Sequence, residues 1–420
     1  MQAGQALRCG RRHVVVAFAF AAMVLAYTDR VNLAVAAVPM RTQFGWSQSV
    51  KGLVLAAFFV GYLLFQIASG ALAQRFGGKR VLGIAVLWWS LFTLFTPLAA
   101  TTSVAALIGA RVGLGLGEAA LLPATYELFS RWVPAGERAR SLGGFLSGVP
   151  LGQIVGFAAT GYLSARAGWP VSFYLFGALG ILWAAAFVRA VHNDPATDRA
   201  VGAPERALLP RPDHAAAERT PWGALLKVPM VRAFIAAHFC HNWALYILVS
   251  WLPSYFNEHL GLGVQQAGLY SALPWVTNFA ALLFGGSLSD ALIARGARAL
   301  NVRRLISAAG LSGVAVGLAL LPQAASAGVA LVVTCAVSAA IGLTAAGFTP
   351  VPLDVSARHA PMLIGFSNTL ATIPGMAGVA VTGWLLDLTH GYAATFLLTA
   401  GIGVCGALLL AMTPGRVPEG

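Results

Sequence analysis

Charged residues are scarce in this sequence. Asp, Glu, Lys and Arg together make up only 10% of its 420 residues, whereas soluble globular chains carry about 25%. So few charges could not cover the surface of a soluble protein of this length. Hydrophobic residues make up 58% of the chain, and they come in runs long enough for a helix to cross the ~30 Å of a hydrocarbon layer. The composition therefore excludes an ordinary soluble domain and predicts a membrane protein.

Cysteine frameworks and catalytic motifs are also lacking. The four cysteines are scattered without C-x-x-C spacing, which argues against a disulfide framework or a metal site: Cys9, Cys240, Cys335 and Cys405. There is no Walker loop and no G-x-S-x-G, and His238 and His241 lack further ligands nearby. The G-x-G spacing in RVGLGLGEAALLP follows no strand, so no dinucleotide loop is expected. We expect no cofactor, no metal and no enzymatic activity.

Twelve apolar segments can be counted, with one long polar stretch between the sixth and the seventh. They span 13–37, 51–72, 81–99, 104–129, 141–163, 171–190, 230–256, 266–289, 303–322, 327–350, 361–385 and 392–412. The first resembles a signal peptide but is too long for one, and we interpret it as an uncleaved helix. The division predicts an N-terminal half at 1–190, a mobile cytoplasmic linker at 191–228 and a C-terminal half at 229–420.

The basic residues predict the orientation. The net charge of +13 does not indicate nucleic-acid binding here, because its residues lie in loops between apolar runs. With the N-terminus inside, the inner loops and tails hold 22 of the 27 Lys and Arg, and the outer loops hold only Arg41, Lys51 and Arg166. Lys and Arg concentrate on the cytoplasmic side of membrane proteins. Both termini are therefore expected in the cytoplasm, with the chain in the cell's inner (plasma) membrane.

The two halves repeat a basic turn at matching positions. GALAQRFGGKR (70–80) follows the second segment, and GSLSDALIARGARALNVRR (286–304) follows the eighth. General positive-inside patterning would produce part of this similarity. Two six-helix halves repeated in parallel are typical of the major facilitator architecture, in which substrate binds between the halves. The predicted fold class is an all-α membrane protein with twelve transmembrane helices and this fold, and a monomer is expected.

Four charges fall inside apolar segments: Asp29 and Arg30 in the first, and Arg111 and Glu118 in the fourth. A charge at the bilayer centre costs roughly 2.5–3.5 kcal/mol on insertion scales, so these residues are the best functional candidates. Arg111 and Glu118 are seven residues apart and share a helix face. The two arginines are expected at similar depth in the outer half of the membrane.

The four charges sum to zero, which suits an empty cavity. If Asp29 and Glu118 each take up a proton, the site becomes positive and favours a carboxylate or phosphate, which guanidinium groups bind with paired hydrogen bonds. This predicts coupling between protons and an anion. Structural ion pairs that join the first and fourth helices are the alternative.

Polar side chains in other segments are expected to complete the site. The candidates for substrate contact are Tyr62, His241, Tyr246, Ser367 and Asn368. Such residues more often make hydrogen bonds between membrane helices, and the same applies to Asn242, Asn278 and Thr372.

Several stretches resemble the anion:cation symporter branch of the major facilitator superfamily: YTDRVNLAVA (27–36), GYLLFQIASGALAQRFGGKR (61–80), RVGLGLGEAALLPA from 111, HFCHNWALYILVSWLPSYF (238–256) and GFSNTLATIPGMAGVAVTGWLLD (365–387). The resemblance implies that Arg30 and Arg111 hold the anion and that Asp29 and Glu118 take up protons. It matches Tyr62 and Asn368 to substrate contacts, and His241 to the place of a third arginine in vesicular glutamate carriers.

Two departures from the family pattern stand out. Val149 occupies a place where bacterial sugar-acid symporters have a glutamine, which argues against a strongly hydroxylated substrate. VPLDVSA (351–357) keeps only Asp354 of a longer motif.

The leading hypothesis is proton-coupled symport of a small organic anion by alternating access, with sodium as an alternative to the proton. The second hypothesis is an efflux permease that exchanges protons for drugs or metabolites. A cation exporter should carry membrane acids without paired arginines, which is not the pattern here. A sensor built on a transporter scaffold would need a signalling domain, and a membrane enzyme would need a catalytic constellation.

Overall fold

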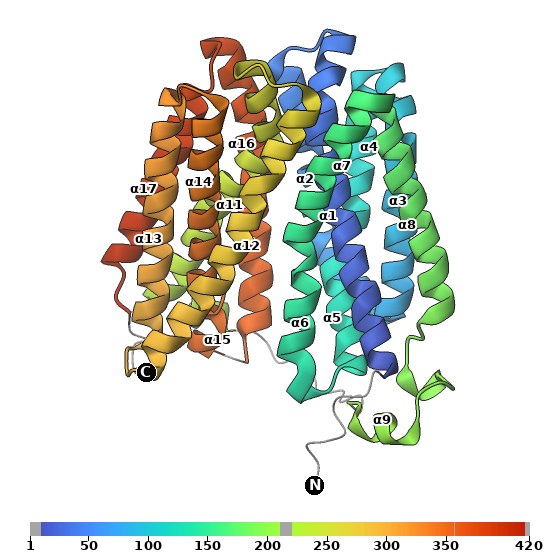
Figure 1. Ribbon diagram of the computed structural model, residues 1–420. Helices are drawn as coiled ribbons and strands as arrows, with labels where there is room; N and C mark the ends of the chain where they lie inside the picture. The colour runs from blue at the N-terminus through green and yellow to red at the C-terminus, as the bar shows by residue number, and fades with distance from the viewer. Residues whose placement is uncertain (1–9, 211–220, 357, 416–420) are drawn as a thin grey trace. The chain divides into compact units, whose positions relative to one another are not determined.

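The computed structural model describes residues 10–210, 221–356 and 358–415, and in these ranges the chain forms helices and no strand (Figure 1). The α-helices are α1 (Arg11–Phe44), α2 (Gln48–Phe76), α3 (Gly78–Thr102), α4 (Val104–Glu118), α5 (Leu121–Trp132), α6 (Arg138–Leu146), α7 (Gly148–Ala167), α8 (Pro170–Ala190), α9 (Ala203–Leu208), α10 (Trp222–Leu225), α11 (Pro229–Ser254), α12 (Val264–Ala294), α13 (Ala299–Leu320), α14 (Ala327–Phe348), α15 (Val351–Ser356), α16 (Ala360–Thr389) and α17 (Ala393–Met412). Twelve helical stretches of this part of the chain are long and apolar enough to cross a membrane, which confirms the predicted number.

The fourth and fifth stretches are interrupted where the sequence predicted continuous helices. α4 ends at Glu118, and α5 begins at Leu121. Pro123 causes this break, because it has no N–H to donate to the Ala119 carbonyl one turn earlier. The Ser69 hydroxyl donates to that carbonyl instead, at 3.2 Å. Pro150 explains the break between α6 and α7 in the same way, and the first break places Glu118 at an irregular helix end.

The described chain divides into two compact units, whose bounds differ from the predicted halves. Unit 1 comprises the described parts of Met1–Arg30, Val60–Gln153 and Val171–Ala216, and unit 2 comprises those of Val31–Phe59, Ile154–Pro170 and Ala217–Gly420. The helices α1, α2 and α7 therefore pass from one unit into the other. The division at 1–190 and 229–420 stays a prediction.

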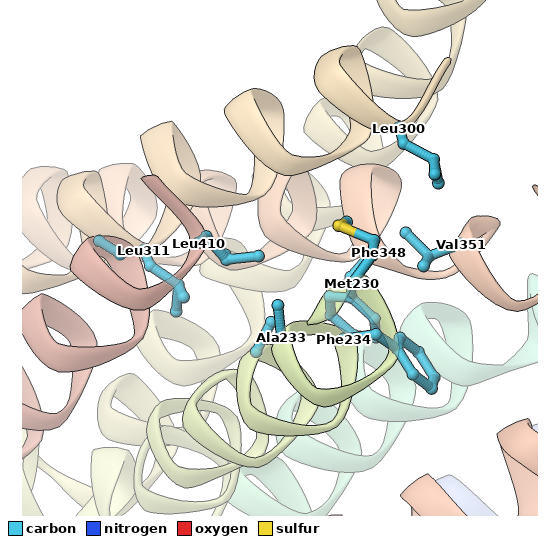
Figure 2. Close-up of a cluster of buried hydrophobic side chains, with 10 residues drawn as sticks. Met230, Ala233, Phe234, Leu300, Leu311, Phe348, Val351 and Leu410 are labelled. Atoms are coloured by element: carbon cyan, nitrogen blue, oxygen red, sulfur yellow. The ribbon is translucent and has the colours of Figure 1, made fainter. Parts of the chain in front are cut away.

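Unit 2 has an apolar core built from α11, α13, α14, α15 and α17. Figure 2 shows Met230, Phe234, Phe348 and Val351 in this cluster, together with Leu410 from the last helix. All are buried. Tight side-chain packing, and not the hydrophobic effect alone, holds helices together where lipid replaces water. The cluster fixes the position of α11, which carries polar side chains discussed below.

The first part of the predicted linker is packed against unit 1, contrary to the expectation of mobility. Asp198 and Val201 are buried, and Asp198 pairs with Arg11 at 3.0 Å. Arg12 joins Glu137 at 2.8 Å and Glu205 at 3.2 Å. The sequence composition missed these partners because all of them lie far apart along the chain. Residues 211–220 of the predicted linker lie outside the described ranges.

Asp198, which joins the linker to Arg11 of α1, has a lowered pKa. Burial alone would raise the pKa of its carboxyl group, but the Ala200 N–H and the Arg11 guanidinium donate hydrogen bonds to it, and together with the charges of Arg11 and His192 they hold the pKa below its usual range. A carboxylate held in this way is stabilised in its charged form. The contact between α1 and the linker therefore depends on Asp198 being ionised.

Candidate functional site

The four charged residues predicted to lie within the membrane come together in unit 1. Asp29 and Arg111 are each 2% exposed, and Glu118 is 1% exposed. Arg30, on α1, donates from Nη2 to Oε2 of Glu118, on α4, at 2.8 Å. Arg111 interacts electrostatically with Asp29, Glu118 and Arg30. The sequence placed Arg111 and Glu118 on one helix face, and the structure adds the direct bond between Arg30 and Glu118.

The Arg30–Glu118 bond also ties α1 to α4, so it has the structural role that the alternative assigned to it. A buried ion pair of this kind contributes little net stability, because removing both charges from water costs about as much as their attraction returns. Two acidic residues and two arginines in one low-dielectric region are therefore a poor choice for stability alone. This cost is the physical argument for a function.

Two aromatic rings lie against the Arg30 guanidinium. Its Cζ is 4.5 Å from the centre of the Tyr27 ring and 5.3 Å from that of Tyr62. Rings at this distance attract a cation through their electron-rich faces. Tyr62 was predicted as a substrate contact, whereas Tyr27 was missed. The signal for Tyr27 is its position three residues before Arg30, which puts both on one helix face.

Asp29 and Glu118 each keep one oxygen without a hydrogen-bond partner within the described ranges, Oδ1 and Oε1 respectively. Both carboxyl groups are buried, and Asp29 interacts with Glu118 by repulsion and with Arg111 by attraction. Buried polar atoms are normally hydrogen-bonded, so such exceptions call for an explanation. A proton shared with a substrate or with water would satisfy them.

The remaining predicted contacts lie in unit 2, on the neighbouring helices α11 and α16. His241, Tyr246 and Ser367 are buried, and Asn368 is half-buried. Ser367 bonds to Nδ1 of His238 at 2.9 Å, so its hydroxyl already joins the two helices. The Nδ1 atom of His241 is buried and makes no hydrogen bond to the described part of the chain. His241 thus keeps a polar atom that is free to meet a ligand.

Three other polar residues serve helix packing. Asn242 donates to the Ala371 carbonyl at 2.8 Å, and Asn278 donates to the Ser338 carbonyl at 2.9 Å. Thr372 donates to the Asn368 carbonyl within its own helix, at 2.8 Å. These are the hydrogen bonds within and between helices that were weighed as the alternative. The predicted single site that joins both sets of residues stays a prediction, because the sets lie in different units.

The structure reveals two buried polar residues that the sequence analysis did not place correctly: Lys51, which it assigned to a loop, and Gln153, which it missed. Lys51 was counted in an outer loop, but the structure places it inside α2 with no exposed side-chain surface, so that assignment is wrong. Gln153 on α7 is 2% exposed and lies one helical turn after Val149. An amide on the same face as Val149 weakens the argument against a hydroxylated substrate. Within the described ranges, no group of three or more His, Cys, Asp or Glu residues is placed to hold a metal ion.

A family model described as Major Facilitator Superfamily matches residues 19–378 of the chain. The chain belongs to this superfamily. A solved structure of the same fold, a bacterial homologue of the human lysosomal transporter Spinster, has a TM-score of 0.76 at 20% identity, and the match covers 97% of this chain and 99% of that one. The predicted fold class of twelve transmembrane helices in the major facilitator fold is confirmed.

Relatives of this superfamily member are named as anion transporters. A probable anion transporter 4, chloroplastic, of Oryza sativa subsp. japonica is 38% identical, over 90% of this chain and 64% of that protein. The chain therefore spans somewhat less than two thirds of that relative. The sodium-dependent phosphate transport protein 1, chloroplastic, of Arabidopsis thaliana is 36% identical over 95% of this chain and 78% of its own length. Human sialin is 31% identical over 96% of this chain and 89% of its own length. These relatives confirm the resemblance drawn from the sequence motifs.

Proposed function

We propose that this protein is a secondary transporter that carries a small organic anion, a carboxylate, together with protons. The observation that carries the proposal is the Arg30–Glu118 bond of 2.8 Å in a buried group that also holds Asp29 and Arg111. Relatives named as transporters of anions, including phosphate, support the choice of an anion as cargo. A cation exporter should carry membrane acids without paired arginines, which is not the pattern here.

The geometry suggests how proton and anion binding are coupled. While Glu118 is ionised, it neutralises Arg30 and competes with any anion for the guanidinium. When Glu118 takes up a proton, Arg30 keeps its charge, and an incoming carboxylate replaces the lost negative charge. Anion binding and proton binding then favour each other, as linkage requires. Arg111 supplies the second positive charge, and Asp29 supplies a second proton site.

We assign the other polar residues to recognition of the rest of the substrate. Tyr62 holds the Arg30 guanidinium, while Tyr246, His241, Ser367 and Asn368 contact the substrate from α11 and α16. We further propose that residues 1–190 and 229–420 act as the two moving halves of a monomer. Both termini are then cytoplasmic, since that side holds 22 of the 27 basic residues, and the site of action is the cell's inner membrane.

Binding measurements on the purified protein test the class of cargo. A thermal-shift screen would compare monocarboxylates, dicarboxylates, sugar acids and phosphate with organic cations, each in sodium and in choline buffers. We expect stabilisation by one class of anion, greater at low pH and independent of sodium. Stabilisation by cations alone would favour the exporter. A requirement for sodium, as in the name of one relative, would replace the proton in the mechanism.

A further inference from the structure

Lys51 is a fully buried ammonium group at one end of unit 2. It lies on the first turn of α2, and its Nζ is 2.6 Å from Glu258 Oε1 and 3.0 Å from the Ser254 hydroxyl. The same atom is 4.8 Å from the centre of the Trp251 ring. All three partners lie on α11 or on the turn that follows it. The beginning of α2 is therefore tied to the end of α11 through a group that has no contact with solvent.

A second attachment holds the same end of α2 to α16. Asp387 accepts hydrogen bonds from the backbone N–H groups of Gln48, at 2.9 Å, and Ser49, at 2.7 Å, and from the Ser49 hydroxyl. Free N–H groups and the helix dipole make a helix N-terminus attractive to a carboxylate. Here the capping carboxylate comes from a different helix. The Gln48 side chain also donates to Glu258, at 2.7 Å, and thus connects the two attachments.

Glycines bring the backbones into contact directly beside this network. A Cβ on Gly52 of α2 would lie 3.2 Å from the Cα of Gly383 on α16. This contact leaves no room for water or a solute between the two helices. Beside the network, α2 and α16 are therefore held together both by side chains and by backbone packing.

Breaking one contact of this network is unfavourable. Separating a buried charge from its partner leaves that charge uncompensated, unless water enters at the same time to solvate both. A polar cavity of about 240 Å³, lined by Arg41, Glu258 and Asp387 among others, lies next to the network and can supply that water. Arrangements in which the Lys51–Glu258 ion pair is broken but no water has entered are therefore unfavourable. Such a contact switches between two states, closed and hydrated.

We propose that Lys51, Glu258 and Asp387 form a polar latch that closes one entrance to the substrate path, and that the latch opens and hydrates in every transport cycle. The latch joins a helix of the first sequence half to helices of the second half. The proposal requires only that the protein alternates between two states, and it does not depend on whether the cargo is an anion.

The test measures how fast a maleimide reaches a cysteine that the closed latch should shield from water. Ser250 on α11 is 5% exposed and lies one turn before Ser254. In a background with the four native cysteines replaced by serine, Ser250→Cys would be labelled in proteoliposomes by a membrane-impermeant maleimide, without any substrate. Lys51→Met keeps the side-chain stem and removes the charge, so we expect labelling at least tenfold faster. Arg41→Met is the matched control, since Arg41 lies 4.0 Å from the same carboxylate and is partly exposed; we expect less than a twofold change.

Equal labelling rates in the Lys51→Met variant and its parent would overturn the proposal. If Lys51→Met does not fold, a cross-link decides the question. In the same background, Ser49→Cys with Asp387→Cys places two thiols at the second attachment, where a disulfide should prevent opening. We expect oxidation to stop both labelling of Ser250→Cys and solute exchange, and reductant to restore them. If the fully oxidised protein is labelled as fast as the same protein with its disulfide reduced, the latch is refuted. Failure of the anion proposal would leave these labelling results unchanged.

Discussion

Replacing Glu118 by glutamine should remove one of the two protons that are coupled to anion binding. In the native protein one carboxylate, 2.8 Å from Arg30, competes with the substrate for that guanidinium. Two unit charges ~4 Å apart interact by about 4 kcal/mol at an effective dielectric constant of about 20. The substrate must replace an interaction of this size whenever Glu118 is ionised. Since a tenfold change in affinity corresponds to about 1.4 kcal/mol, protonation of Glu118 could alter anion affinity by two orders of magnitude or more.

The measurable consequence is the slope of log Kd against pH. Each proton taken up with the anion contributes about one tenfold change in Kd per pH unit in the range where it is exchanged. With Asp29 and Glu118 both titrating, the native slope should approach two, and Glu118→Gln should lower it by one. Glutamine keeps the shape and a hydrogen-bonding oxygen, so the substitution removes mainly the charge. The assay is equilibrium binding of a labelled anion between pH 5 and 8.

The matched control is Glu127→Gln. Glu127 also pairs with an arginine, Arg131, at 2.7 Å, but it does so within one helix end and is partly exposed. We expect this variant to keep the native slope. A Glu118→Gln protein that folds, binds the anion and retains the full pH slope would refute the role given to Glu118.

Three further predictions concern the arginine, the helix packing and the docked linker. Arg111→Ala should reduce anion uptake to background while insertion and yield stay normal, whereas Arg232→Ala, near the start of α11, should leave uptake unchanged; flux assays in proteoliposomes check both. Gly61→Ala should lower the melting temperature by several degrees, because its Cβ would clash with the Val112 backbone, while Gly109→Ala, with no atom within 4 Å, should be neutral; equal melting temperatures would contradict this. Asp198→Asn should destabilise the protein at neutral pH but not in acid: the lowered pKa means that the stabilisation is fully present above the ordinary carboxyl pKa and disappears as pH falls through the lowered value, and thermal melts from pH 7 to 3 measure the difference.

Much of the fold follows from the sequence, because twelve long apolar segments and the distribution of basic residues need no tertiary information. The helix breaks were harder to predict. Pro123 and Pro150 act on a carbonyl four residues earlier, but proline inside a membrane helix often leaves the helix continuous. Whether a break forms depends on a donor such as Ser69, which the fold supplies.

The four central charges were found because a charge within an apolar run is conspicuous. The pairing of these charges could not be predicted, since Arg30 and Glu118 are 88 residues apart and meet only when α1 packs on α4. Lys51 was misassigned for a related reason. It lies at the edge of an apolar segment, where charges are normally solvated, and its partner Glu258 is 207 residues away. The same holds for the linker, in which Asp198 and Glu205 pair with Arg11 and Arg12 of α1.

Proton-driven uptake tests the central claim most directly. Proteoliposomes containing the purified protein would be loaded at pH 7.5 and diluted to pH 6.0 with the labelled carboxylate that gives the largest thermal shift, beside Arg30→Ala and Glu118→Gln proteins. We predict that the native protein accumulates the anion above its external concentration and loses that accumulation with a protonophore. Arg30→Ala should not transport, and Glu118→Gln should accumulate the anion to a much lower level, because only Asp29 is left to take up a proton. Accumulation by Arg30→Ala, or unaltered accumulation by Glu118→Gln, would contradict the account.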